Sequence, residues 1–280
     1  MNGILLGASY GLVGAGFAVT YGISRVLNFA HGAFFVVGSY GVYALNTWFG
    51  LPLGLAFVGG SIFVLPMALV SYYVVIRPYG PEKSGTALLG TFGVATIIIE
   101  TMRQIFGGRP LILARLVDLP PMTLMHNVYV PIDQAVVAGF AVVVLAASLG
   151  LLRWTGIGRR LRAIVQSDEA AQLIGIRPEP YRKLSFISGS WLAGVAGSGL
   201  AFLSPINTSN GVNMTFIAFV IVVLAGLGNI GGAAIVGVLL AILQALSALY
   251  VRPEVSIAAP YLFMIAVLVM RPQGLFPTRA

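Results

Sequence analysis

The feature that most constrains this chain is a series of long apolar stretches, each close to the length that crosses a lipid bilayer. Hydrophobic residues make up 58% of the 280 residues, and charged residues make up 9%. An ordinary soluble domain carries roughly a quarter charged residues, and a soluble core of this size cannot hide so much apolar surface. The sequence therefore predicts an all-α fold, a polytopic transmembrane helical bundle.

Nine of these stretches approach the roughly 20 apolar residues that a spanning helix needs. We predict about nine spans, with eight or ten as alternatives, because the breaks at Asn28–Gly32 and Gly228–Gly232 are short. No segment of the size of a water-soluble domain separates them, so residues 1–280 are expected to form a single membrane domain. The expected spans are residues 3–24, 32–48, 53–76, 85–106, 133–152, 184–204, 214–230, 232–250 and 257–270.

The positions of the basic residues predict which way the bundle faces, because cytoplasmic loops of membrane proteins carry an excess of Lys and Arg. Residues 153–183 hold seven of the 16 basic residues, so we place this interval in the cytoplasm. Counting spans outward from it puts five more basic residues inside and four outside. The N-terminus and residues 107–132 are then outside, and the C-terminus is cytoplasmic. The net charge of +8 is thus a topology signal, and we expect no nucleic-acid partner. The four basic residues that this count places outside are Arg103, Arg109, Arg115 and Arg252.

Several kinds of chemistry are excluded by what the sequence lacks. The chain has no Cys and only two histidines, His31 and His126, so it holds no thiolate metal site and no H-E-x-x-H motif. It also has no G-x-x-x-x-G-K-[ST] motif, so it cannot bind ATP through a P-loop. We therefore expect a transport subunit rather than an enzyme, with no catalytic residue, metal or cofactor of its own. Energy must come from a partner or a gradient.

A short helix is predicted inside the basic cytosolic interval. Ser167 suits an N-cap, and Asp168 and Glu169 lie in the first turn, where carboxylates meet the positive end of the helix. Gly175 fits the C′ position, and Pro178 stops the chain soon after. A helix of about two turns is marginal in water by itself. It is either a surface helix that caps a loop or a coupling helix docked into a partner protein.

A second candidate is the run Asn28-Phe-Ala-His31-Gly32 between two apolar stretches. Asn and His are costly in a membrane unless they are paired or face a cavity, and broken helices need protein or water to satisfy their backbone groups. One interpretation places His31 at the cytosolic interface, where it bonds a loop carbonyl; the other is a gate or pathway lining. Asn229-Ile-Gly-Gly-Ala233 is a weak echo of this run and also opens a Gly-spaced helix. The candidate pathway or gate residues are Asn28, His31, Gly32, Thr91 and Asn229.

The predicted span of residues 85–106 carries a carboxylate, Glu100, in its later part. Arg103 follows at i+3 on the same face, so we expect a local ion pair, with direct substrate contact as the alternative. Glycine accounts for 35 of the 280 residues without a Gly-X-Y period. Such a content is typical of membrane helices that pack closely through small residues, and the threonines of this span, Thr91 included, fit the same role.

Four motifs that follow one another along the chain resemble those of the branched-chain amino acid (high-affinity amino acid) ABC transporter permease family. Glu169-Ala170-Ala171, followed by Gly175, is similar to the EAA loop of ABC-importer permeases, in which Ala170 and Ala171 would offer a slim docking face. One departure is Ala33, where the family usually has Glu after the His-Gly pair, and this leaves the cargo open. The other three motifs are Tyr21-Gly-Ile-Ser-Arg-Val-Leu-Asn-Phe-Ala-His-Gly32, Ala225-Gly-Leu-Gly-Asn-Ile-Gly-Gly232 and Arg271-Pro-Gln-Gly-Leu-Phe276.

The resemblance implies the membrane-spanning permease subunit of an ATP-driven importer in the bacterial inner membrane. Its cargo would be branched-chain or related amino acids and similar small solutes, because relatives also handle urea, short amides and small carboxylic acids. Its partners would be the lipid bilayer, a paralogous or identical second permease, two cytosolic ABC ATPases that bind ATP and Mg²⁺, and a periplasmic substrate-binding protein. The ATPase-coupling candidates are then Asp168, Glu169, Ala170, Ala171 and Gly175.

Two other classes of function are weighed against this one. A secondary transporter or a facilitative channel for small polar solutes would need ionisable relays inside the membrane, and Glu100 alone qualifies. A membrane-embedded enzyme would need an acid–base or metal constellation, and the sequence offers none. Copurification of an ATPase with the chain would discriminate among the three.

Overall fold

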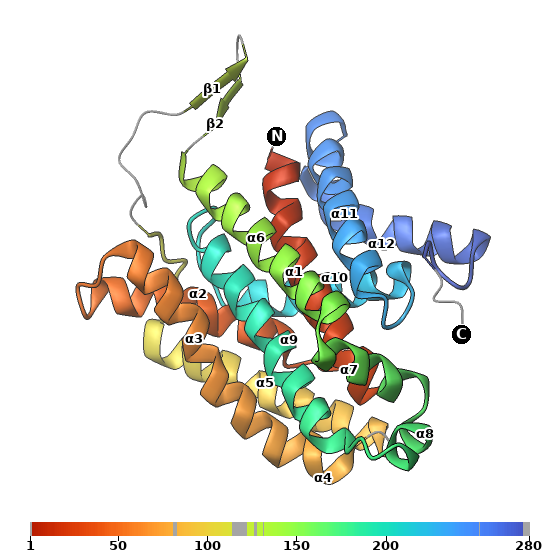
Figure 1. The fold of residues 1–280 in the computed structure, drawn as a ribbon. Coiled ribbons are helices and arrows are strands. Elements are labelled where there is room, and N and C mark those ends of the chain that lie inside the picture. The colour runs from red at the N-terminus through yellow and green to blue at the C-terminus, as the bar shows by residue number, and fades with distance from the viewer. Residues whose placement is uncertain are drawn as a thin grey trace.

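The computed structural model describes residues 2–80, 83–113, 122–125, 128–130, 132–251 and 253–276. Figure 1 shows the described chain as a helical bundle. A π-helix, η1 (Tyr72–Ile76), joins α3 (Leu53–Ser71) to α4 (Arg77–Tyr79). His126, Arg115 and Arg252 lie outside the described residues, as does Arg279, one of the five further basic residues placed inside. The helices are α1 (Asn2–Ser24), α2 (His31–Thr47), α3 (Leu53–Ser71), α4 (Arg77–Tyr79), α5 (Ser84–Phe106), α6 (Ile132–Trp154), α7 (Gly156–Gln166), α8 (Asp168–Leu173), α9 (Pro178–Leu200), α10 (Ser209–Ala225), α11 (Ile230–Tyr250) and α12 (Pro253–Met270).

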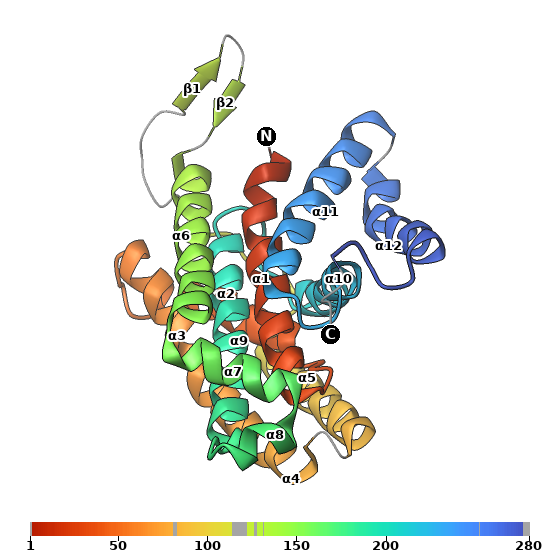
Figure 2. The same cartoon turned by 45° about the vertical axis from the view of Figure 1, so that its right-hand side comes forward.

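Each predicted span coincides with a helix, and this confirms the helical bundle. By length and composition, five of the described helical stretches can cross a membrane, while α10 and Val255–Met270 are apolar but shorter. The exact number of spans and their orientation stay predictions. A short antiparallel hairpin, β1 (Met122–Met125) and β2 (Val128–Val130), follows α5 and precedes α6 along the chain. It projects from one end of the bundle, beyond α6 (Figures 1 and 2). The five helical stretches that can cross a membrane are Leu6–Ser24, Leu53–Tyr79, Ser84–Phe106, Ile132–Trp154 and Ile230–Tyr250.

Helix α1 forms the centre of the bundle, and 83% of the residues in the apolar part of its Leu6–Ser24 stretch are buried. It packs between α9 and α11 (Figure 2). Its glycines allow this contact: a Cβ at Gly7 would lie 3.1 Å from the Cα of Val238 on α11. On α2, a Cβ at Gly38 would collide with the carbonyl oxygen of Gly194 on α9. The expectation that glycines serve close helix packing is therefore confirmed.

Helices α5 and α6 lie at the periphery, and only 22% of the residues in the apolar stretch of each helix are buried. Their outer faces carry large apolar side chains, such as Leu89 and Phe92 on α5. In a membrane protein such faces meet lipid or another membrane subunit. Helix α7 instead turns across one end of the bundle (Figures 1 and 2), with Leu161 and Ile164 buried and three arginines exposed.

Candidate functional site

The short helix α8 forms as the sequence predicts, with a cap at each end. At its start, the Ser167 hydroxyl accepts a hydrogen bond from the Ala170 N–H at 3.2 Å. At its end, Gly175 has φ +83°, and its N–H donates to the Gln172 carbonyl at 3.0 Å. The Ile176 N–H donates to the Ala171 carbonyl at 2.9 Å. These two bonds make a Schellman motif, which ends the helix and turns the chain away.

One face of α8 is fixed to its own chain. The side chain of Ala171 is 1% exposed and packs in a cluster with Ile23, Leu161 and Ile164. The prediction that Ala171 offers a slim face to a partner is therefore wrong. Its small side chain instead lets α8 approach α7 and the end of α1. Ala170, the other small residue of the motif, is exposed.

Ion pairing and hydrogen bonding hold α8 against α9. The Arg182 guanidinium on α9 pairs with the Asp168 carboxylate in the first turn of α8. Next to it, the Arg160 guanidinium on α7 donates to the Tyr181 hydroxyl on α9 at 2.9 Å. Helices α7, α8 and α9 therefore form one connected unit at this end of the molecule. Asp168 acts within that unit, whereas Glu169 stays exposed.

The exposed tip of α8 carries two large apolar side chains that sequence reasoning missed. Leu173 is 88% exposed and Ile174 is 72% exposed. Single exposed hydrophobic residues are common on proteins, but here two large ones are adjacent at the end of a capped helix. The signal in the sequence was the pair Leu173-Ile174 directly before Gly175.

His31 opens α2 in the middle of the bundle, with no exposed surface. Its Nε2 lies 2.9 Å from the carbonyl oxygen of Val13 on α1, and its ring meets Phe17 edge-on at 5.3 Å. The interpretation of His31 as an interfacial residue that bonds a loop carbonyl is therefore wrong, because the carbonyl belongs to a helix in the core. If Nε2 donates this bond, Nδ1 is the unprotonated ring nitrogen.

Two buried nitrogens of this turn have no hydrogen-bond partner among the described residues: His31 Nδ1 and Asn28 Nδ2. The Asn28 Oδ1 is used, since it accepts from the Ala30 N–H at 3.0 Å. Buried polar atoms are normally satisfied, and an exception calls for an explanation such as a strained or functional position. The Asn28–Gly32 turn carries two such exceptions.

Two threonine hydroxyls hold the Asn28–Gly32 turn from opposite sides. The Phe29 N–H donates to Thr91 Oγ1 on α5 at 3.1 Å, and the Gly32 N–H donates to Thr215 Oγ1 on α10 at 3.0 Å. The structure thus brings together four of the predicted pathway residues: Asn28, His31, Gly32 and Thr91. Thr215 was missed, because nothing in its apolar sequence context distinguishes it.

Asn229, the fifth predicted pathway residue, caps α11. Its Oδ1 accepts from the Gly232 N–H at 2.8 Å, and its Nδ2 donates to the Phe276 carbonyl at 2.9 Å. These bonds tie the α10–α11 turn to the C-terminal segment rather than to the Asn28–Gly32 turn. The echo between the two motifs is therefore local: each asparagine Oδ1 accepts a backbone N–H where a helix begins.

Glu100 forms the expected local ion pair on an exposed part of α5. Its Oε2 lies 2.6 Å from Arg103 Nη2, and its Oε1 accepts from Gln104 Nε2 at 3.3 Å. The prediction of an i,i+3 pair is confirmed. Direct contact with a substrate is not needed to explain this carboxylate.

Comparison with known proteins agrees with these features. A family model described as "Branched-chain amino acid transport system / permease component" matches residues 1–269. The chain belongs to this family. The high-affinity branched-chain amino acid transport system permease protein LivH of Escherichia coli K12 is 30% identical over 287 residues, covering 98% of this chain and 93% of LivH. The permease protein LivM of the same organism is 23% identical and covers 96% of this chain and 68% of LivM.

The fold of this permease-family chain is also found in a solved structure. A chain of PsaBC from Streptococcus pneumoniae, in complex with Fab, aligns with a TM-score of 0.53 and 13% sequence identity. The alignment covers 97% of this chain and 91% of that chain. At this identity the likeness concerns the fold alone. Together with the apolar helices, the family match makes the chain a multi-pass membrane permease.

Proposed function

We propose that this chain is the membrane-spanning permease domain of an ATP-driven importer that takes up branched-chain or related amino acids. The cargo class follows from the family, and Ala33 leaves urea, short amides and small carboxylic acids as alternatives. A periplasmic binding protein would deliver the solute across the bacterial inner membrane. The observation that carries the proposal is α8, a capped helix held to its own chain on one side and unpartnered on the other.

Helix α8 is proposed as the coupling element to a cytosolic ABC ATPase. Leu173 and Ile174 would enter an apolar groove on the ATPase, with Glu169 and Ala170 beside them. Asp168, Ala171 and Gly175 would position the helix through the ion pair, the buried seat and the C-terminal turn. Because α8 is fixed to α7 and α9, a push on its tip would be transmitted to the bundle rather than absorbed by a loose loop.

The Asn28–Gly32 turn is proposed as a gate element. The arrangement described here would be its closed form, because the hydroxyls of Thr91 on α5 and Thr215 on α10 both accept hydrogen bonds from it. Separation of α5 from α10 would release two backbone N–H groups and uncover the unpaired nitrogens of Asn28 and His31. Those groups would then line a wet pathway, where their hydrogen-bonding capacity is satisfied. Asn229 would act only as the cap of the neighbouring turn.

The proposed assembly has two permeases, two ATPases that bind ATP and Mg²⁺, and the binding protein. A paralogous second permease is favoured because LivH and LivM, both similar to this chain, come from one organism. The proposed orientation is N-terminus outside and α8 inside. It is supported by the placement of the N-terminus and the β1–β2 hairpin at the end of the bundle opposite α8 (Figures 1 and 2).

The test is solute uptake by the reconstituted complex. The chain, tagged and purified from membranes, is expected to bring down a second permease and an ATPase. In proteoliposomes, uptake of a branched-chain amino acid should require ATP inside and binding protein outside. Uptake by the chain alone, independent of ATP, would overturn the proposal in favour of a secondary transporter or channel.

The orientation has its own test, because the chain contains no cysteine. Cysteines replace Ile112, exposed between α5 and α6, and Gln172, exposed on α8. In intact cells, a membrane-impermeant thiol reagent should label the first and miss the second. The reverse pattern would place α8 outside and remove it from any contact with a cytosolic ATPase.

A further inference from the structure

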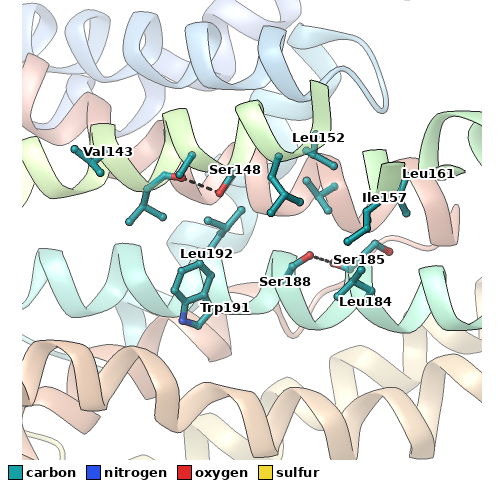
Figure 3. A pocket seen from close by; sticks show the side chains of 14 residues that line it. Val143, Ser148, Leu152, Ile157, Leu161, Leu184, Ser185, Ser188, Trp191 and Leu192 are labelled. Atoms are coloured by element: carbon teal, nitrogen blue, oxygen red, sulfur yellow. Dashed lines mark hydrogen bonds between the residues drawn. The ribbon is translucent and has the colours of Figure 1, made fainter. Parts of the chain in front are cut away.

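A groove of about 420 Å³ lies between α6 and α9, with α1 behind it and α7 at one end. Figure 3 shows it from close by, with aliphatic side chains of α6 on one side and Trp191 and Leu192 of α9 on the other. It contains none of the candidate coupling or gate residues. It is partly open to the surface of the molecule, so that a ligand from outside the bundle could enter it.

The groove is lined by hydrocarbon, although three serines lie along it. The Ser148 hydroxyl donates to the Val144 carbonyl at 2.8 Å, and the Ser188 hydroxyl donates to the Ser185 carbonyl at 3.2 Å (Figure 3). The Ser185 hydroxyl donates to the Arg182 carbonyl of its own helix at 3.0 Å. Each hydroxyl proton is therefore used within its helix. A zwitterionic amino acid would lose its hydration here without compensation, whereas an acyl chain fits.

The α7 end of the groove is basic. Ile157 and Leu161 of α7 line the groove, and Arg160, which does not line it, is the surface neighbour of Ile157 at i+3. Arg160 is held there by the Tyr181 hydroxyl, one turn of α9 before Leu184, which also lines the groove. Helix α7 contains three arginines and no acidic residue, and the ion pairs within the described ranges involve none of them.

We propose that this groove binds an anionic phospholipid, with one acyl chain between α6 and α9 and the headgroup phosphate on Arg160. Charge complementarity selects the occupant, because basic pockets at the ends of membrane helices bind anionic headgroups. Helix α7 has the amphipathic character of a helix that lies in the membrane interface. Trp154, 80% exposed at the end of α6, suits the same depth, where tryptophan is enriched.

Lipid in the groove would also support α8. Leu161 lines the groove and belongs to the cluster that seats Ala171. An acyl chain against Leu161 would therefore stiffen the seat of the coupling helix. This consequence rests on the proposed coupling function, whereas lipid binding itself does not. The two can fail separately, because binding is measured without ATP or an ATPase.

The experiment uses Trp191 as the reporter, since it lines the groove. The 280 residues contain three tryptophans, so Trp48→Phe and Trp154→Phe leave Trp191 as the single reporter. The protein is reconstituted in vesicles of unmodified phosphatidylcholine. Increasing amounts of a lipid with brominated acyl chains are added, either brominated phosphatidylglycerol or brominated phosphatidylcholine. We expect Trp191 fluorescence to be quenched at about fivefold lower amounts of the anionic lipid, the preference that one basic contact supplies. High salt should reduce this preference.

Variants locate the site. Arg160→Gln should abolish the preference for phosphatidylglycerol, while Arg159→Gln, on another face of α7, should keep it. Ser188→Phe should fill the groove and reduce quenching by both lipids. Circular dichroism and gel filtration report whether each variant folds, and the arginine pair still decides the matter if Ser188→Phe does not fold. Equal quenching by the two lipids would mean ordinary boundary lipid, and absence of quenching would mean that another helix covers the groove; either result overturns the proposal.

Discussion

The tip of α8 and the Asn28–Gly32 turn break the usual distribution of polar and apolar side chains in opposite directions. At the tip, Leu173 and Ile174 are 88% and 72% exposed at the end of the bundle where water is expected. In the turn, Asn28 and His31 are 1% and 0% exposed and each has a nitrogen with no partner among the described residues. Both arrangements cost free energy in the isolated chain.

The difference lies in what would satisfy each region. The apolar tip would be covered by a surface from outside the chain, such as the proposed partner protein. The polar turn would be satisfied by water or a solute that reaches the interior, as in a second conformation of the same chain. On the proposed function, a docking element and a moving element therefore leave opposite marks on one static structure. Variants of the turn and of α8 can separate the contacts that stabilise the fold from the contacts proposed for gating and docking.

The largest effect is expected for Gly32→Ala. A Cβ at Gly32 would collide with the Gly211 carbonyl oxygen and with Thr215 Oγ1. Overpacking of this kind costs about 1–3 kcal/mol and sometimes more, so the purified variant should lose thermal stability or fail to accumulate. Gly93→Ala is the matched control, because a Cβ there meets open space. Equal stability of the two variants would show that α2 and α10 are not tightly packed at the turn.

Ala171→Leu should come next. The larger side chain would overpack the cluster with Ile23, Leu161 and Ile164, at a cost of about 1–3 kcal/mol that α8 can partly escape by lifting off. Proteolysis of the α7–α9 segment should speed up while the rest of the bundle keeps its melting temperature. Ala170→Leu, at an exposed position, should leave both unchanged. Unchanged proteolysis in Ala171→Leu would contradict the buried seat.

Thr91→Val should destabilise the turn by about 1–3 kcal/mol, because the Phe29 N–H loses its acceptor inside the bundle. Thr96→Val tests the same chemistry on the outer face of the same helix. There the hydroxyl bonds only the Phe92 carbonyl of its own helix at 3.0 Å, so the change should be small. Chemical denaturation of the two purified variants gives the comparison. Equal losses would remove Thr91 from any special role.

The smallest effect on stability is expected for Asn28→Ala. The variant loses the bond from the Ala30 N–H, but it also removes a buried Nδ2 that has no partner in the described part of the chain. The two changes oppose each other, so stability should shift by about 1 kcal/mol or less. Uptake should nevertheless change if the turn is a gate. A loss of stability as large as that of Thr91→Val, with normal uptake, would show that Asn28 is purely structural.

Features that depend on neighbours in sequence were predictable. The helices that coincide with the nine predicted spans follow from apolar runs, and both ends of α8 follow from Ser167 and Gly175. The ion pair of Glu100 and Arg103 follows from helical spacing.

Features that depend on contacts between distant segments were not predictable. Ile23, at the end of α1, packs in the cluster that buries Ala171 on the inward face of α8. The carbonyl of Val13 on α1 is the partner of the buried His31 ring. Thr91 and Thr215 meet at one turn although they lie more than a hundred positions apart, which no local pattern encodes.

The central claim, that the tip of α8 docks an ATPase, is tested most directly by the double variant Leu173→Asp, Ile174→Asp. Both side chains are exposed, so the chain should fold and insert as the wild type does. Loss of two apolar anchors should cost at least about 2 kcal/mol of binding, which is roughly 30-fold in affinity. The measurement is the amount of ATPase that copurifies per permease, with Gln172→Asp on the same helix as the control. The account predicts little ATPase with the double variant and the wild-type amount with the control, and wild-type amounts with both would contradict it.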